Sequence, residues 1–198
     1  MKENLAAGTI FVLLFLRQIQ PHMKLREIIN PWTGLDAYNC FGCSPTNPIG
    51  AHMRFFEENP DDLYGDIVSI WHPTQNHQSW INTLHGGMVA TLLDEVCGWV
   101  VFKKLKTSGV TAKMELRYKH PVSTVNGPLQ LKARLKSDNH RVSLVEGELW
   151  GKPAPDADYQ ICATAECTYF SFPEAKSREM GYLEPALSTS DYSLEDLM

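Results

Sequence analysis

The sequence predicts an α+β protein in which one long helix packs against an antiparallel β-sheet. Two segments with strand character come first, a long apolar helical segment follows, and four more strand segments complete the pattern. Turn residues separate the later segments, as they do between antiparallel neighbours. One helix combined with a run of such strands is typical of the α+β class.

The composition indicates one domain and excludes several partners. The chain has 198 residues, of which 43% are hydrophobic, so it can bury a complete core. Its formal net charge is −5, and it contains no basic run or basic-aromatic stripe of the kind that binds nucleic acid. We therefore expect a cytoplasmic protein without a nucleic-acid or membrane partner.

Residues 1–22 are expected to lie outside the core. Residues 5–16 form an apolar run, shorter than the roughly 20 residues that span a bilayer. No small-residue cleavage pattern follows this run, and Met23 offers an alternative start. We favour an N-terminal extension, with a signal peptide or a membrane anchor as the alternatives.

The first elements of the domain, which we place at residues 23–172, are short. A lead helix is expected at residues 24–29, before Asn30 and Pro31. Strand formers then occupy residues 53–58 and 63–71, and the turn residues between them predict a hairpin. Polar loops are expected on either side of this pair, at residues 32–50 and 72–84.

The apolar helix begins after His85 with two glycines. At a helix start, Gly86 and Gly87 expose backbone N–H groups that the helix itself cannot satisfy. At 100° per residue, one apolar stripe faces the sheet: Val89, Leu92, Leu93, Val96 and Val100. Asp94 lies opposite that stripe, on a face of mostly small residues. Simple exposure to solvent is the alternative for Asp94, and Glu95 ranks below it as a functional carboxylate.

The remaining strands and the tail follow from the same patterns. Strand formers occupy four segments: residues 110–120, 129–137, 142–150 and 159–172. Residues 173–198 are polar, and we expect a loosely held C-terminal tail.

The five cysteines indicate reduced thiols and no metal site. They are scattered along the chain, at Cys40, Cys43, Cys97, Cys162 and Cys167. Only the first two form a CxxC motif, and a tetrahedral metal site needs two more ligands. His52 could approach these thiols, but we favour a tight turn with buried cysteines.

The helix suggests a site shared between two subunits. Gly87 and Asp94 are seven residues apart, which is about 10 Å along a helix axis. A carbonyl held by the glycine amides needs its carboxylate within about 3 Å, or one water away. A second copy of the helix, related by a two-fold axis, could supply that carboxylate, so we predict a homodimer.

Several segments resemble the hotdog-fold acyl-CoA thioesterases of the phenylacetic-acid-pathway type. The helix contributes His85-Gly86-Gly87 with Asp94 nine positions after the histidine. The other similar segments are Cys40-Phe41-Gly42-Cys43, Asn47-Pro48-Ile49-Gly50, His77-Gln78-Ser79-Trp80 and Met114-Glu115-Leu116-Arg117-Tyr118-Lys119-His120-Pro121-Val122. The resemblance covers about residues 40–172.

The resemblance implies a hotdog fold, with a long helix wrapped by a curved antiparallel sheet, in a homodimer or homotetramer. It implies that the Gly86 and Gly87 amides polarise the thioester carbonyl. Asp94 takes the place of a nucleophile or of a general base for water. Thr111 matches a Ser/Thr that helps to position the water or the carboxylate, and His85 would fix the loop or contact the substrate.

Substrate contacts are harder to assign. Ser79 stands where neighbouring branches carry Asn or Gln, so Gln78 or Asn82 could take that polar role. The turn with His140 and Arg141 is the candidate for binding CoA phosphates, although such a turn is often merely solvated. Aromatic residues could line an acyl pocket or simply belong to the core: Trp80, Trp99 and Phe102.

The function expected from this resemblance is hydrolysis of an acyl-CoA thioester to a carboxylic acid and CoA, without a metal or a bound cofactor. Two alternatives stay open. One is an acyl-CoA hydratase or dehydratase on the same fold, and the other is a non-enzymatic acyl-CoA-binding module.

Overall fold

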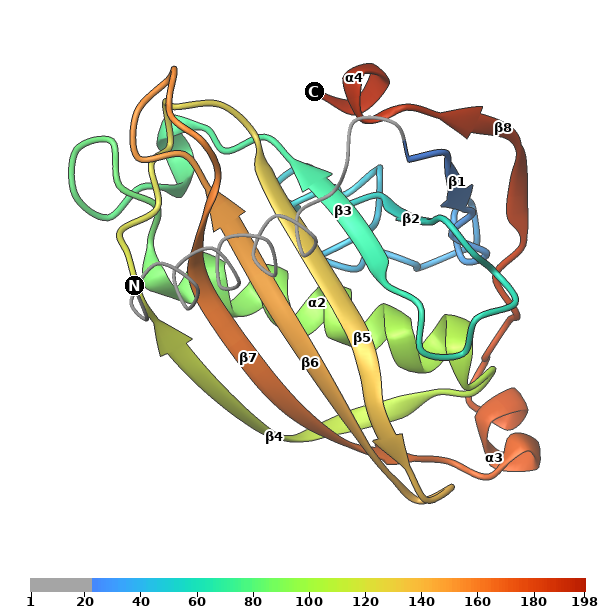
Figure 1. Ribbon diagram of the computed structural model, residues 1–198. Helices are drawn as coiled ribbons and strands as arrows, with labels where there is room; N and C mark the ends of the chain where they lie inside the picture. Colours follow the sequence, from blue (N-terminus) through green and yellow to red (C-terminus); the bar gives the residue numbers. More distant parts are fainter. Residues whose placement is uncertain (1–22) are drawn as a thin grey trace, which may run out of the picture.

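The computed structural model describes residues 23–198, so the predictions for residues 1–22 lie outside the described part of the chain. One eight-stranded antiparallel sheet has the strand order β4-β7-β6-β5-β3-β2-β1-β8 (Figure 1). The strands are β1 (Leu25–Ile28), β2 (Phe55–Glu57), β3 (Ile67–Trp71), β4 (Gly109–Tyr118), β5 (Leu129–Asp138), β6 (Val142–Gly151), β7 (Gln160–Ser171) and β8 (Leu187–Tyr192). The helices are α2 (Gly86–Lys104), α3 (Glu174–Glu179) and α4 (Leu194–Leu197). The predicted hotdog fold is confirmed.

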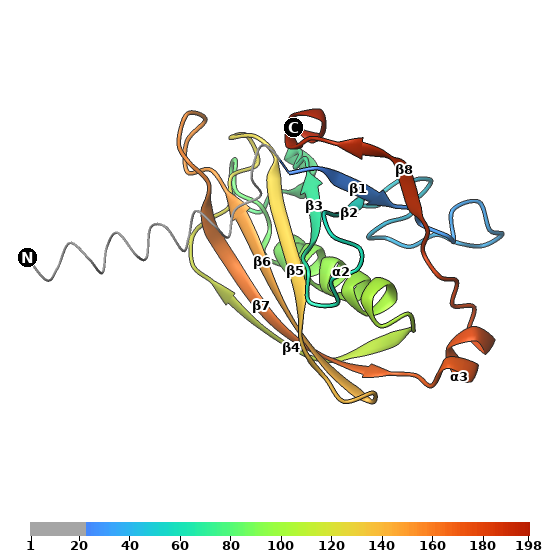
Figure 2. The ribbon, with the colours of Figure 1, turned by 45° about the vertical axis from the view of Figure 1, so that its right-hand side comes forward.

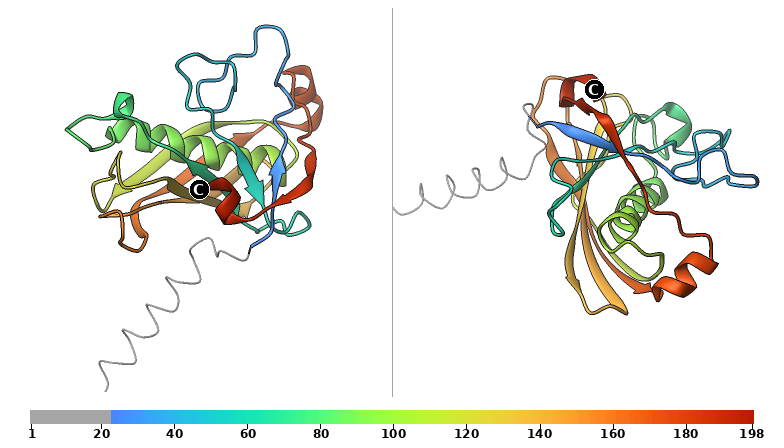
Figure 3. Two further views of the ribbon diagram at one scale, coloured as in Figure 1. Left: turned by 90° about the horizontal axis from the view of Figure 1, so that it is seen from above. Right: turned by 90° about the vertical axis from the view of Figure 1, so that its right-hand side faces the viewer.

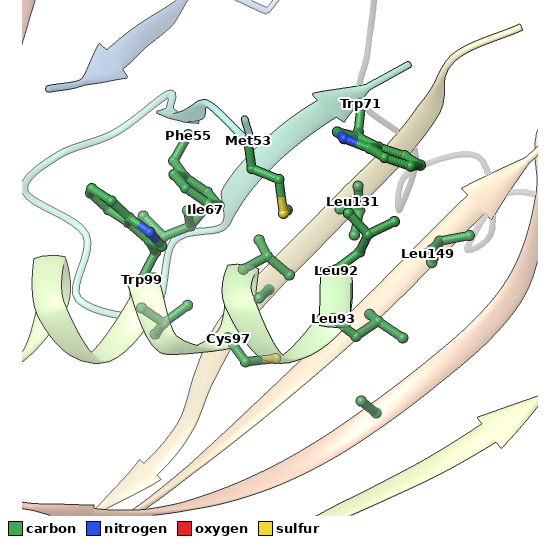
Figure 4. Close-up of a cluster of buried hydrophobic side chains, with 14 of the residues drawn as sticks. Met53, Phe55, Ile67, Trp71, Leu92, Leu93, Cys97, Trp99, Leu131 and Leu149 are labelled. Atoms are coloured by element: carbon green, nitrogen blue, oxygen red, sulfur yellow. The ribbon is translucent and has the colours of Figure 1, made fainter. Parts of the chain in front are cut away.

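The sheet curves around α2, which lies along its concave face (Figure 2). The predicted apolar stripe of α2 faces this sheet, and Leu92, Leu93 and Val96 have no exposed surface. Side chains from the β-strands and from residue Met53 pack against it (Figure 4). Burying an aliphatic side chain of this size contributes about 1.5–3 kcal/mol. This packing therefore fixes the rotation of α2 about its axis, and only the face away from the apolar stripe can carry a site.

Five of the six predicted strands after residue 50 have close to the expected bounds. The sixth, predicted at residues 63–71, begins later, as β3. The hairpin predicted between the first two is also present, because β2 and β3 pair antiparallel with Phe56 opposite Val68. The polar loop at residues 72–84 contains one 3-10 turn, Gln75–His77.

The lead helix predicted at residues 24–29 is wrong, because this segment forms β1. The strand pairs with β2 on one side and with β8 on the other. Leu25 packs in a small cluster with Phe56 and Leu194, whereas Ile28 packs in the main core. Both faces of β1 are therefore covered, and the apolar-polar alternation that identifies a half-exposed strand is missing.

The prediction of a loosely held C-terminal tail is also wrong. Strand β8 extends the sheet beyond β1 (Figure 3). Leu194 of α4 belongs to the same small cluster. The Tyr182 hydroxyl donates a hydrogen bond to the Phe102 carbonyl oxygen of α2 at 2.9 Å. Backbone pairing needs no apolar side chain, so a polar strand at a sheet edge gives little sequence signal.

Within residues 23–198, no helix combines the length and the apolar character that a membrane span requires.

Candidate active site

The first turn of α2 offers one free backbone donor instead of the two that the sequence predicted. His85 is the N-cap, and its Nδ1 accepts a hydrogen bond from the Gly87 N–H at 2.9 Å. A capping side chain satisfies one orphan donor in this way. Across the described residues the Gly86 N–H has no acceptor, so it is free to donate to a group outside the chain.

A shallow, mostly apolar groove lies beside Gly86. It is lined by Thr83, Leu84, Val89, Tyr118, Pro121 and Val122, among others. Tyr118, at the end of β4, donates its hydroxyl to the Gly86 carbonyl oxygen at 2.8 Å. This bond ties the start of α2 to the edge of the sheet.

Asp94 lies on the face of α2 that turns toward β4 and β7. Thr111 Oγ1 donates to Asp94 Oδ1 at 2.9 Å, and the Tyr169 hydroxyl lies 3.0 Å from the Asp94 carbonyl oxygen and 3.3 Å from Oδ1. Asp94 is half-buried. Burial, followed by nearby acidic groups, raises the pKa of Tyr169, so this phenol keeps its proton and acts as a donor.

The pairing of β4 with β7 creates this arrangement. Thr111 lies directly opposite Tyr169, and a bulge at Ala112 follows immediately. A bulge adds one unpaired residue and re-aims the neighbouring side chains. Two residues 58 positions apart in the sequence thus contact one carboxylate.

Glu95 turns to a different side of the helix. Its Oε1 accepts a hydrogen bond from Trp99 Nε1 at 3.2 Å and lies 3.8 Å from Cys40 Sγ. Burial raises the pKa of Glu95 to about 7. The same cluster lowers the pKa of Cys40 to about 5, chiefly through the hydrogen bond from Cys43.

Several polar groups of the loop before α2 form hydrogen bonds within the loop itself. Gln78 Oε1 accepts a hydrogen bond from the Asn82 N–H at 3.1 Å, and the Ser79 N–H donates to the Thr83 carbonyl oxygen at 2.8 Å. All three predicted substrate contacts, Gln78, Ser79 and Asn82, are exposed. They lie close to the start of α2, because the His85 N–H donates to the His77 carbonyl oxygen.

The turn with His140 and Arg141 lies at the other end of the helix. The Arg141 carbonyl oxygen accepts a hydrogen bond from Ser171, which pairs with Gly109 at the start of β4. A Cβ built on Gly109 would lie 3.4 Å from Val101 in the last half of α2. One chain therefore does not bring this turn to Gly86, and both residues are exposed.

The aromatic residues divide between core and surface. Trp99 is fully buried and stacks on Phe55 with ring centroids 4.5 Å apart, so its core alternative is confirmed. Trp80 is 80% exposed, and Phe102 packs edge-on against Trp32.

Two tyrosines that contact this site, Tyr118 and Tyr169, are not among the residues predicted from the sequence. Tyr118 lies in a segment that resembles the thioesterases, which could have marked it. Tyr169 could be found only from the strand register, because its relevance depends on lying opposite Thr111.

The family model described as thioesterase superfamily matches residues 81–154. The resemblance is confirmed. The matched segment includes the start of α2, Asp94 and Thr111, and it indicates thioester hydrolysis as the general class of reaction. A comparison with curated proteins gives no match.

Two solved structures with TM-scores above 0.5 agree with this fold, and a third is reported for its sequence similarity. A thioesterase superfamily protein is 23% identical over 85% of this chain and 77% of its own, with a TM-score of 0.56. An acyl-CoA hydrolase from Staphylococcus aureus is 14% identical over 56% and 68% of the two chains, with a TM-score of 0.51. A phenylacetic acid degradation-related protein from Ralstonia eutropha JMP134 is 27% identical over 53% and 75%, with a TM-score of 0.46.

Proposed function

We propose that the protein hydrolyses acyl-CoA thioesters as a homodimer whose two active sites each combine residues from both subunits. Asp94 carries this proposal. It is a half-buried carboxylate, held by two hydroxyl donors, within the segment that matches the thioesterase superfamily. A solvated surface aspartate would not need two such donors to fix its position.

The carbonyl contact in this proposal is the Gly86 N–H. It lies at the positive end of α2, where an amide donor and the helix dipole both favour a developing negative charge. Gly87 does not contact the carbonyl in this proposal, because its N–H donates to His85 Nδ1. His85 thereby holds the first turn in shape.

Two subunits are proposed because one chain separates these groups. Gly86 and Asp94 are eight residues apart, which is about 12 Å along the helix axis. Strand β4 is an edge of the sheet, ten residues long and largely exposed. Such an edge readily pairs with another chain. Thr111 and Tyr118 both lie on it, so pairing there would bring a second α2 toward Asp94 and Gly86.

The reaction consumes one water and one acyl-CoA and yields a carboxylic acid and CoA. As a general base, Asp94 takes a proton from water while the water oxygen attacks the thioester carbonyl, and the proton then passes to the leaving thiolate sulfur. As a nucleophile, its carboxylate attacks the thioester carbonyl and expels CoA as the thiolate, and water then hydrolyses the resulting anhydride and provides the proton that the thiolate takes up. Thr111 orients the carboxylate in both routes.

Substrate contacts follow from the same dimer. Gln78, Ser79 and Asn82 lie beside the start of α2 and are proposed to contact the thioester side of the substrate. His140 and Arg141 are proposed to contact CoA phosphates from the second subunit, because their own chain places them at the far end of α2.

The test is thiol release from a panel of acyl-CoA thioesters by the purified full chain. We expect Asp94→Ala to lower kcat by about 10²–10⁴-fold, the usual contribution of acid–base catalysis. Asp191→Ala, which changes an exposed aspartate on β8, is the matched control and should keep full activity. Thermal unfolding should show that both variants are folded.

Equal activity in Asp94→Ala would overturn the assignment of this residue. Turnover of an enoyl-CoA without thiol release would identify a hydratase instead. Saturable acyl-CoA binding with no reaction would identify a binding module.

A further inference from the structure

Two thiols and a carboxylate meet on a side of α2 that the proposed reaction does not use. Cys43 Sγ and Cys40 Sγ are 3.4 Å apart, and Cys40 Sγ is 3.8 Å from Glu95 Oε1 and 4.0 Å from Oε2. All three potential ligand atoms lie within 4.8 Å of one another. The cluster joins the loop after β1 to the middle of α2.

The loop is tightly built around these atoms. Backbone hydrogen bonds anchor it to the following segment, from the Ala51 N–H to the Phe41 carbonyl oxygen and from the Met53 N–H to the Gly42 carbonyl oxygen. A Cβ on Gly42 would lie 2.3 Å from the Glu95 carboxylate, so only glycine allows this approach.

The Glu95 carboxylate has no cationic partner. Within residues 23–198, its hydrogen-bond partners are Cys40 and Trp99, and no Lys, Arg or His forms an ion pair with it. A half-buried carboxylate is stabilised by hydrogen bonds, by protonation or by a cation. A cation between the carboxylate and the two sulfurs would be the positive partner that this carboxylate lacks among the described residues.

The distances fit a tetrahedral zinc ion. With zinc–sulfur bonds of about 2.3 Å and zinc–oxygen bonds of about 2.0–2.2 Å, neighbouring ligand atoms are separated by about 3.5–3.8 Å. The Cys40–Cys43 and Cys40–Glu95 separations of 3.4 and 3.8 Å need little adjustment, and the third pair, Cys43 Sγ and the Glu95 carboxylate, lies within 4.8 Å. Two thiolates favour zinc over magnesium or calcium, which prefer oxygen ligands.

We propose that Cys40, Cys43 and Glu95 bind one zinc ion, with water at the fourth position, and that this ion fixes the Cys40–Cys43 turn to α2. Tyr38 and Asn30 support the site from outside. The Tyr38 hydroxyl lies 3.1 Å from Cys43 Sγ, and Asn30 Nδ2 donates to Tyr38 and to the Cys43 carbonyl oxygen. Such outer contacts orient metal ligands. His52, a candidate from the sequence, is not in the cluster, and its Nε2 contacts the Asn47 carbonyl oxygen instead.

The test uses the untagged full chain, reduced, stripped of metal with a chelator and then titrated with zinc or cobalt. We expect one zinc per chain and, with cobalt, the thiolate charge-transfer absorption of a tetrahedral site. Cys40→Ser and Cys43→Ser should lose both signals, and Glu95→Gln should bind zinc at least about tenfold more weakly. Cys162→Ser and Asp94→Asn are the matched controls, and both should retain one zinc.

Three outcomes would overturn the proposal: no zinc binding by the reduced wild-type chain, unchanged binding by Cys40→Ser, or unchanged binding by Glu95→Gln. A Cys40–Cys43 disulfide in the purified protein, with no metal uptake after reduction, would identify a redox pair instead. If a serine variant fails to fold, zinc-dependent thermal stabilisation of the wild type, reversed by chelator, provides the second measurement. Zinc binding and thiol release are separate measurements, so the zinc proposal can fail while the proposed thioesterase function holds, and the reverse.

Discussion

Asp94 and Glu95 are adjacent in the sequence and occupy contrasting surroundings. Asp94 is held by the hydroxyls of Thr111 and Tyr169 beside the exposed edge strand β4. Glu95 lies against two thiols and the buried Trp99 indole. One step along a helix turns a side chain by 100°, so one carboxylate can serve a substrate while its neighbour holds a loop.

The largest effect is expected from a test of whether the Asp94 site is shared between subunits. Asp94→Asn and Gly86→Pro should each lower kcat in homodimers by about 10²–10⁴-fold. Proline removes the Gly86 N–H but suits the first position of a helix, and His85 before it has φ −64° and ψ 135°, which a following proline accepts.

A co-expressed heterodimer of these two chains should recover half of the wild-type activity, because one of its two sites is then intact. Gly86→Ala is the matched control: it keeps the N–H, and its Cβ would lie an ordinary 3.4 Å from Tyr118. An inactive heterodimer would show that each site lies within one chain.

A smaller effect is expected when the support of Asp94 is loosened. Tyr169→Phe removes a hydroxyl that contacts the Asp94 carboxylate, and we expect kcat to fall about tenfold with little change in KM, since 1.4 kcal/mol corresponds to a tenfold change in rate. Tyr182→Phe removes a hydroxyl that binds a carbonyl of the same helix, at Phe102, far from Asp94.

Both variants should lose stability by about 0.5–1.5 kcal/mol in urea unfolding. Only Tyr169→Phe should lose activity. Equal kcat values for the two variants would assign Tyr169 a purely structural role.

The smallest effect on catalysis is expected on the Glu95 side. With chelator and reductant present, Glu95→Ala should keep kcat close to the wild-type value, because Glu95 contacts no group of the proposed reaction. It should lower the free energy of unfolding by about 1–3 kcal/mol, since the buried Trp99 N–H loses its acceptor. Glu174→Ala, on the exposed face of α3, should change stability by less than about 0.5 kcal/mol. A large loss of activity in Glu95→Ala would remove the distinction between the two carboxylates.

Much of this arrangement could be predicted from the sequence because it depends on local periodicity. The apolar stripe of α2 and strands β2 to β7 follow directly from side-chain patterns. Strand β1 and strand β8 could not be predicted in the same way. The first is covered on both faces, and the second is polar and held mainly by backbone pairing.

The sequence by itself determined that an apolar helix begins at two glycines and carries Asp94 away from its buried face. Only the tertiary structure decided the partners of that helix. The β4–β7 register brings Tyr169 opposite Thr111, the His85 ring occupies the Gly87 amide, and the chain before β2 brings two cysteines to Glu95. The physical reason is range: helical periodicity is set by neighbouring residues, whereas these contacts depend on how distant segments pair and pack.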